Sequence, residues 1–254
     1  YKRQYLEKYP PTHQVEIYEN TAWSCAHGVD RWKKDCGCNS GMHPRWGQGW
    51  RAPLRDALDW LRDHLAAQYE EKAGEFLKDP WEARNRYIDV ILNRNEDTVN
   101  AFLKENAIRE LSEAEQHVVL KLLEMARQAM LMYTSCGWFF DELSGIETVQ
   151  IIQYAGRAIQ LSEEIFGDDV EAEFVSRLEK AKSNISGFKD GRWIYEKFVK
   201  PSMVDLMKVG AHYAISSLFE QDGAKTFGFS VEREDYHTTT AGKTKMAYGR
   251  LRVT

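Results

Sequence analysis

Hydrophobic residues recur with the spacing of a helix along most of the chain from residue 53 onward. Pro53 suits the first turn of a helix, because its missing N–H would have no intrahelical partner there. Four leucines follow at intervals of four, three and four residues, with charged residues between them: Leu54, Leu58, Leu61 and Leu65. This spacing places them on one helix face and predicts an amphipathic helix from residue 53.

The same period predicts further helices after Pro80 and over 112–133, 145–167 and 169–184. In each of them the apolar positions fall three or four residues apart, so one face can enter a core. The short helix after Pro80 is expected to run through Ile88, Ile91 and Leu92. The apolar residues of the later helices include Val119, Leu122, Leu123, Ala126 and Met130, and then Val170, Phe174, Leu178 and Ala181 on one face.

Capping signals support these boundaries. Ser112 and Glu115 have the spacing of a capping box, and Gly167 is placed to end the helix that precedes it. A last long helix is expected over 202–220, opened by Pro201.

The pattern changes after Gly223. Two stretches rich in β-branched and aromatic residues, 225–235 and 243–253, flank a polar turn at Ala241 and Gly242. This arrangement predicts a β-hairpin. The chain begins without methionine and stops within the second stretch, so we expect a piece of a longer protein and a sheet completed by strands outside it.

The expected fold is therefore mainly α. It consists of a helical bundle of about six or seven helices, a long N-terminal loop rich in cysteine and tryptophan, and a short C-terminal hairpin. The predicted parts are 1–52 for the extended segment and loop, 53–222 for the bundle and 223–254 for the hairpin.

Composition argues against a nucleic-acid-binding, a membrane-spanning or a disulfide-rich secreted protein. The chain has 254 residues, 43% hydrophobic and 29% charged, and a net charge of −5, which gives no footprint for nucleic acid or an anionic membrane. The sequence contains no apolar run of the roughly 20 residues that span a bilayer. Four cysteines are too few for a disulfide-stapled secreted scaffold, so we expect reduced thiols and a cytoplasmic location.

The loop over 20–50 has five glycines and fits neither a helix nor a strand period. Loops of this length are often functional. Two pairs of metal-binding residues lie in it with one residue between the members of each pair, and together they could supply a tetrahedral zinc site: Cys25 and His27, Cys36 and Cys38.

Two alternatives to this zinc site stay open. The distant Cys136 could complete a set of four thiolates, suited to zinc or an iron–sulfur cluster. The cysteines could instead be inert thiols, because cysteine is one of the most buried residue types. We further predict that the loop over 21–41 folds back beside 134–138, so that Cys136 approaches the loop cysteines and Trp23, Trp32 and Trp138 border one pocket.

A second unusual stretch, "TSCGWFFDELSG" over 134–145, interrupts the helical pattern. Trp138 could stack on a sugar ring while Asp141 binds its hydroxyls. The alternative is a helix end packed with aromatic residues. Asp141 and Glu142 are adjacent in sequence and so are poorly placed as the two acids that face each other across a glycosidic bond. No catalytic residue is assigned.

Three blocks of the sequence carry a family resemblance: "ENTAWSCAHGVDRWKKDCGC", "MYTSCGWFFDELSGIETVQIIQYAGRAIQL" and "KPSMVDLMKVGAHYAISSLFE". They resemble a domain of unknown function found C-terminal to the catalytic domain in proteins similar to glycoside hydrolase family 57, which includes α-amylase-like and α-mannosidase-like enzymes. The likeness covers nearly the whole chain, from about Tyr18 to Thr254.

The resemblance implies that an incomplete (β/α) barrel upstream supplies the nucleophile and the acid. In better-understood relatives a helical domain lines part of the substrate cleft through a Ser-Ser-Asp-Trp-like stretch, and Ser135, Cys136 and Trp138 lie at the comparable place here. A Cys-Gly pair replaces the Ser-Asp pair, so the sugar contact carries over only at Trp138.

The resemblance and the motifs together favour an accessory helical domain of a carbohydrate-active enzyme, inactive by itself. Its partners would be the upstream catalytic domain of the same chain and an α-glucan or α-mannan substrate. The residues expected to contact substrate are Trp23, Trp32, Ser135, Trp138 and Asp141. A structural module held by a metal or a thiol cluster is the alternative, and an enzyme with a cysteine nucleophile is a third hypothesis that His27 beside Cys25 only permits.

Overall fold

The computed structural model of the chain describes residues 2–219, 225–226 and 229–254. These residues form two compact units, which we call the helical unit, Tyr1–Pro201, and the C-terminal unit, Ser202–Thr254. The fold is mainly helical with a C-terminal antiparallel hairpin, as the sequence predicts. Between Arg51 and Ser216 seven helices have at least seven residues.

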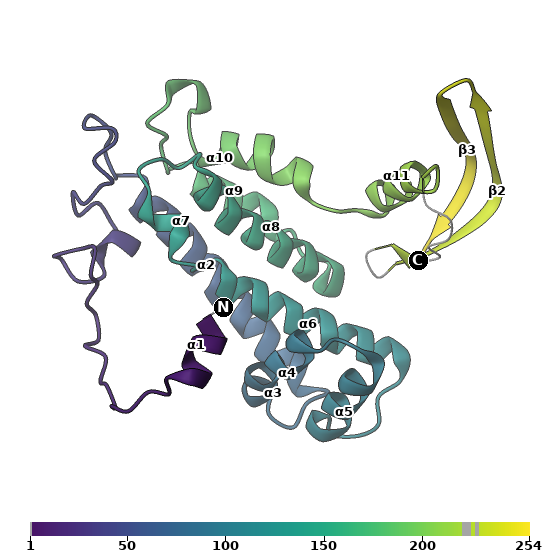
Figure 1. Cartoon of the computed structure of the whole chain (residues 1–254), viewed down its shortest axis with the longest axis horizontal. Helices are drawn as coiled ribbons and strands as arrows, with labels where there is room; N and C mark the ends of the chain where they lie inside the picture. Colours follow the sequence, from purple (N-terminus) through teal and green to yellow (C-terminus); the bar gives the residue numbers. More distant parts are fainter. Residues whose placement is uncertain (1, 220–224, 227–228) are drawn as a thin grey trace. The chain divides into compact units, whose positions relative to one another are not determined.

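Three long helices form the centre of the helical unit: α2 (Arg51–Gly74), α6 (Glu113–Leu131) and α8 (Ile146–Phe166) (Figure 1). α8 packs along α6, and α2 packs against α6 and against α9 (Val170–Leu178). The four leucines of α2 that are spaced along one face are all buried, which confirms the predicted amphipathic helix.

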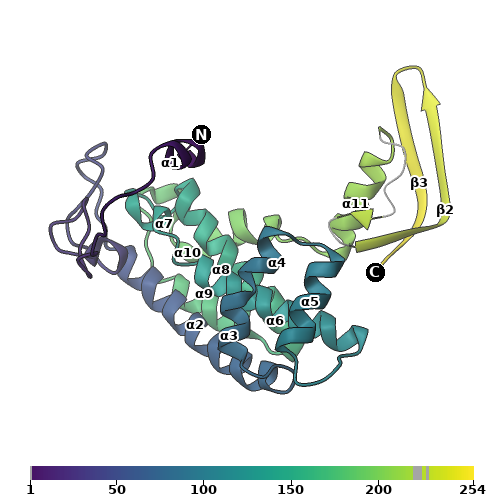
Figure 2. The same ribbon diagram turned by 60° about the horizontal axis from the view of Figure 1, so that its bottom comes forward.

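A cluster of shorter helices covers one end of this core: α3 (Pro80–Arg86), α4 (Ile88–Leu92) and α5 (Glu96–Asn106) (Figure 2). The Asp79 carboxylate accepts from the first N–H groups of α3, and Asn95 caps α5 in the same way. The short helix predicted after Pro80 is present, and Ile88 and Leu92 are both exposed on it. The helix breaks into α3 and α4, and the five-residue α4 buries Val90 instead.

Both predicted end signals are confirmed. Ser112 and Glu115 form the capping box of α6, and Gly167 ends α8 in the left-handed conformation at φ 70°. The chain between these helices makes the four-residue α7 (Cys136–Phe139). After α9 come α10 (Gly191–Ile194), a π-helical turn over Tyr195–Val199 and short 3-10 turns over Ser186–Phe188 and Lys200–Ser202.

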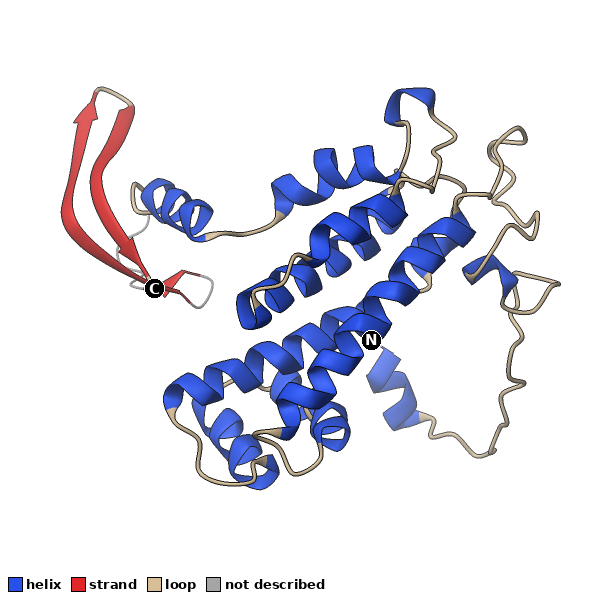
Figure 3. Cartoon of the chain, turned by 180° about the vertical axis from the view of Figure 1, so that it is seen from behind, coloured by secondary structure: helices blue, strands red, loops and turns tan. Residues whose placement is uncertain are grey.

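The N-terminal segment begins with α1 (Lys2–Lys8) and then runs without regular structure to α2, apart from a 3-10 turn over Asp30–Trp32 (Figure 3). The predicted long irregular loop is therefore present. It ends at Trp50, which is buried at the N-terminus of α2.

The C-terminal unit combines α11 (Leu206–Ser216) with β1 (Lys225–Thr226), β2 (Phe229–Ala241) and β3 (Thr244–Val253). β2 and β3 pair antiparallel, and Ala241 faces Thr244 across the turn, which confirms the hairpin. The helix predicted over 202–220 begins at Leu206, and its predicted end at Glu220 lies outside the described residues. α11 packs on β3, and the small core of this unit contains Val209, Tyr213 and Val231.

Candidate metal centre

Two glycines shape the loop that carries the candidate ligands. Gly28 and Gly37 have positive φ angles of 72° and 75°, a conformation that a residue with a Cβ rarely adopts. Gly28 also passes so close to the chain that a Cβ there would lie 2.4 Å from the carbonyl oxygen of Asn20. Gly37 makes the turn between Cys36 and Cys38, which allows both thiols to face the same point.

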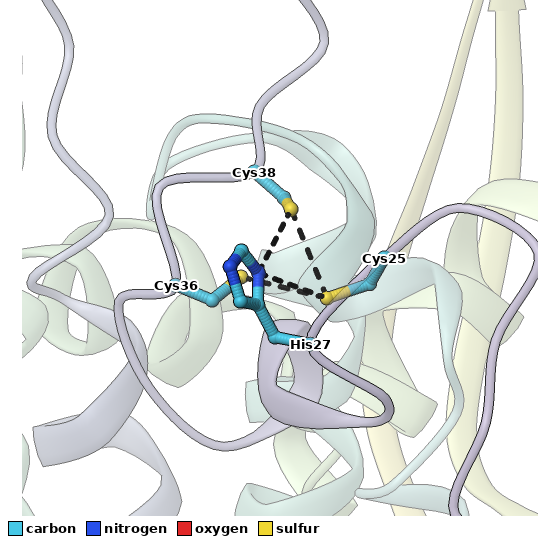
Figure 4. Close-up of side chains that lie close together, drawn as sticks. All are labelled: Cys25, His27, Cys36 and Cys38. Atoms are coloured by element: carbon cyan, nitrogen blue, oxygen red, sulfur yellow. Dashed lines mark hydrogen bonds between the residues drawn. The ribbon is translucent and has the colours of Figure 1, made fainter.

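The structure brings Cys25, His27, Cys36 and Cys38 together (Figure 4). The Cys25 sulfur lies 3.7 Å from the sulfur of Cys36 and 3.7 Å from that of Cys38. His27 Nδ1 lies 3.6 Å from the Cys38 sulfur and 4.0 Å from the Cys25 sulfur. One ligand atom from each residue lies within 4.8 Å of the others, so this group could hold a metal ion.

The group extends from the protein interior to its surface. Cys25 is buried, Cys36 and Cys38 are half-buried, and His27 is exposed. Burial raises the pKa of the Cys25 thiol, but hydrogen bonds from the backbone N–H groups of Arg31 and His27 outweigh it and lower the pKa to about 6. Burial raises the pKa of Cys36. Of these two thiols, Cys25 is therefore the more readily ionised in the absence of metal.

Hydrogen bonds fix the loop to the end of the helical bundle. The indole N–H of Trp32 donates to the carbonyl oxygen of Ser135 at 3.0 Å. The Ser40 N–H donates to the Asp141 carboxylate at 2.9 Å. Arg55 of α2 donates to the Trp32 carbonyl oxygen at 3.1 Å. The loop thus lies beside the segment that contains α7, as the sequence predicts.

Cys136 does not belong to the group of ligand atoms that lie within 4.8 Å of one another. Its side chain is exposed at the start of α7, where it borders a shallow hollow with Glu147 and Gln150. The loop docks through Trp32 and Ser40 rather than through its thiols. The four-thiolate alternative is therefore not formed in this structure.

The residues expected to contact a sugar lie in different environments. Trp138 is 1% exposed and belongs to the core, so it offers no face for stacking. The Asp141 carboxylate is buried and accepts from Ser40 and Gln48. Trp23 is 92% exposed, and its ring lies 6.0 Å from that of Phe139.

Trp32 is half-buried, and Ser135 is exposed. Trp23, Trp32 and Trp138 therefore do not border one pocket. The neighbouring acid Glu142 is buried as well and accepts from the Asn184 N–H at 2.9 Å and from Ser183. Both adjacent acids therefore make hydrogen bonds that join segments of the fold.

The sequence does not predict two residues that lie beside the cysteines: Arg31 and Arg51 are both buried there. Arg51 donates from Nη1 to the carbonyl oxygen of Cys38 at 3.1 Å. Burial lowers the pKa of Arg51, and the nearby charge of Cys36 opposes that shift. The sequence gives little sign that these two arginines are buried, because arginine side chains are mostly exposed in proteins.

The fold and site define a helical protein with a Cys/His group that could hold a metal ion. Residues 46–254 match the family described as domain of unknown function (DUF3536), and the chain belongs to this family. The four candidate ligands precede the matched range. The searches find no match among curated proteins or solved structures. Within the described part of the chain, no helix is long and apolar enough to cross a membrane.

Proposed function

We propose that the loop over 21–41 is a structural metal module that binds one zinc ion through Cys25, His27, Cys36 and Cys38. The observation that carries this proposal is the convergence of the four ligand atoms within 4.8 Å. The module holds the N-terminal segment on the end of the helical bundle.

The distances support a single tetrahedral ion. A zinc ion with Zn–S bonds of about 2.3 Å holds its thiolates about 3.8 Å apart. The two sulfur separations from Cys25 are 3.7 Å. An iron–sulfur cluster of two or more irons would separate thiolates bound to different irons more widely, so it fits this group less well than one ion does.

The loop also needs a source of stability. Fixing a residue's backbone costs roughly 1–2 kcal/mol in conformational entropy. Within 20–50 the described residues form little regular structure, and the hydrophobic side chains buried there are those of Cys25 and Trp50. Two buried hydrophobic side chains contribute little to the free energy of folding of this loop. Metal binding would supply the additional free energy that orders it.

The test uses the chain purified without chelator. We expect about one equivalent of zinc by elemental analysis, lost in Cys25→Ser because the site then lacks a thiolate. Cys136→Ser is the matched control, since this thiol is exposed and outside the group, and it should keep its zinc. Zinc below about a tenth of an equivalent, together with no binding on titration, would contradict the proposal.

A second measurement reports the structural role. Lys33 and Lys34 are exposed within the loop and offer trypsin a cleavage site. We expect a chelator to accelerate cleavage there while leaving the helical bundle intact. Unchanged cleavage after metal removal would show that the ion does not hold the loop.

We also propose a second function, that of an accessory domain in a carbohydrate-active enzyme similar to glycoside hydrolase family 57. The resemblance of three sequence blocks supports it. The exposed indole of Trp23 beside Phe139 supports it too, because such a face can stack on a sugar ring. The partners would be an upstream catalytic domain of the same chain and an α-glucan or α-mannan. Trp23 and Ser135 are the expected residues that remain accessible.

This function is tested with a chain that includes the upstream sequence. Trp23→Ala should raise KM for an α-glucan or α-mannan, whereas Trp46→Ala, which removes a loop indole stacked on His43, should not. Equal effects of the two substitutions would contradict a sugar contact at Trp23. The isolated chain should hydrolyse neither polymer.

A further inference from the structure

Two arginines are buried beside the candidate metal centre. Arg51 is 0% exposed and Arg31 is 4% exposed. Arg51 donates to the carbonyl oxygen of Cys38 at 3.1 Å and, through Nη2, to those of residues 139–140 at 3.5 and 3.3 Å. Arg31 donates to the carbonyl oxygen of Asn39 at 3.4 Å. All of these acceptors are neutral.

Neither guanidinium is fully satisfied by them. The Nε–H of Arg31 and that of Arg51 are buried and have no hydrogen-bond partner within 2–219, 225–226 and 229–254. A buried cation is normally paired with an anion, because water no longer solvates it. A negative charge close to the Arg31 and Arg51 guanidinium groups would therefore stabilise them.

The buried carboxylates among the described residues make no direct ion pair with either arginine. They are those of Asp141 and Glu142, and neither forms an ion pair with Arg31 or Arg51 among the described residues. Asp141 is occupied by Ser40 and Gln48, and the oxygens of Glu142 are occupied by residues 144 and 183–184. Asp141 and Asp35 act on Arg51 through space without a direct ion pair. The thiols of the candidate centre are a further source of negative charge beside it.

We propose that Arg31 and Arg51 are the counter-charge of an anionic metal centre, in which a divalent ion is held by three thiolates and a neutral imidazole. The inference rests on the proposed structural metal module. A divalent ion with three thiolates carries one net negative charge. Arg51 contacts the backbone of this centre at the Cys38 carbonyl oxygen, and Arg31 donates to the carbonyl oxygen of the next residue, Asn39.

This arrangement has a consequence for the choice of metal. A trivalent ion would make the same centre neutral and leave the arginines uncompensated. The pair therefore favours divalent ions such as Zn²⁺ or Co²⁺.

The test measures the zinc Kd of the whole chain by competition with a chromophoric chelator. Arg51→Met removes the charge, Arg51→Lys keeps it, and Arg55→Met is the matched control. Arg55 lies one turn along α2 and holds the same loop at the Trp32 carbonyl oxygen, but it has its own counter-charge in Asp59 at 2.9 Å. We expect Arg51→Met to weaken zinc binding about 10- to 100-fold.

The two comparison variants separate charge from structure. Arg51→Lys should recover most of the affinity, and Arg55→Met should lose less than about threefold because its charge is already paired near the surface. Arg31→Met, a change within the loop that spares the helical core, is the second variant if Arg51→Met does not fold. Unchanged zinc affinity in both Arg31→Met and Arg51→Met overturns the inference.

A double-mutant cycle tests the charge itself. Cys36→His makes the centre neutral, so it should weaken Co²⁺ binding less in the Arg51→Met background than in the original chain. Equal losses in the two backgrounds overturn the inference while leaving the metal module in place. If the original chain binds neither Zn²⁺ nor Co²⁺, the proposed function fails and the inference fails with it.

Discussion

The indole N–H of Trp32 donates to the backbone carbonyl oxygen of Ser135 across 3.0 Å, although 103 residues separate the two in sequence. This bond joins the middle of the cysteine loop to the turn that begins α7. It works together with the bonds from Ser40 to Asp141 and from Arg51 to Cys38. The candidate metal centre is thereby held against the bundle by the fold as well as by its own ligands.

Replacing Asp141 should loosen this docking. Asp141→Ala removes the acceptor of the partly buried Ser40 N–H and of the buried Gln48 amide. We expect a loss of about 1–3 kcal/mol in the free energy of unfolding and faster tryptic cleavage at Lys33. Denaturant titration and timed proteolysis measure the two effects. Asp63→Ala, at an exposed carboxylate, is the control, and equal effects in both variants would argue against the docking role.

Trp138 and Trp23 should respond in opposite ways to substitution. Trp138→Ala removes a fully buried side chain from the core and should cost about 3–5 kcal/mol in the free energy of unfolding. Trp23→Ala removes an exposed side chain and should change that free energy by less than about 0.5 kcal/mol. Thermal and denaturant unfolding would measure both. A destabilising Trp23→Ala with a neutral Trp138→Ala would contradict the assignment of Trp138 to the core.

Gly137 is required by close packing between α7 and α8. A Cβ at this position would lie 2.5 Å from Cγ2 of Ile151. Gly137→Ala should therefore destabilise the fold by about 1–3 kcal/mol through overpacking. At Gly187, a Cβ would meet no atom within 4 Å, so Gly187→Ala is a matched control. Equal free energies of unfolding for the two variants would refute this explanation.

The capping box of α6 should make stability depend on pH in the acid range. Hydrogen bonds from Arg109, followed by those from Ser112, lower the pKa of Glu115 from 4.5 to about 2. Because this pKa is lower in the folded chain, the contribution is complete above pH 4.5 and is lost as the pH falls through about 2.

Glu115→Gln removes this dependence. The difference in unfolding free energy between the original chain and the variant should be largest above pH 4.5 and should shrink toward pH 2. Measuring both chains at each pH cancels the effects of other groups, including metal ligands. A difference that stays constant, or that grows as the pH falls, would show that the charged form of Glu115 does not stabilise the helix start.

Local sequence determined the helices, their ends and the hairpin. The leucines of α2 repeat at the helical period, Ser112 and Glu115 satisfy N–H groups within one turn, and Gly167 permits the left-handed end. These signals act between neighbours in the chain, so they are visible without a structure. The proximity of Cys36 and Cys38 also has a local origin. Gly37 between them adopts a positive φ angle, which lets both thiols face one point.

Only the tertiary structure decided which of the conspicuous residues share a site. Cys136 and Trp138 lie in one short stretch, yet one is exposed and the other is in the core, because only part of the single turn of α7 is covered by neighbouring segments. The burial of Arg51 depends on the loop folding over α2, and no local pattern encodes that contact. Periodicity identifies the face of a helix, whereas the partner that covers the face comes from segments distant in sequence.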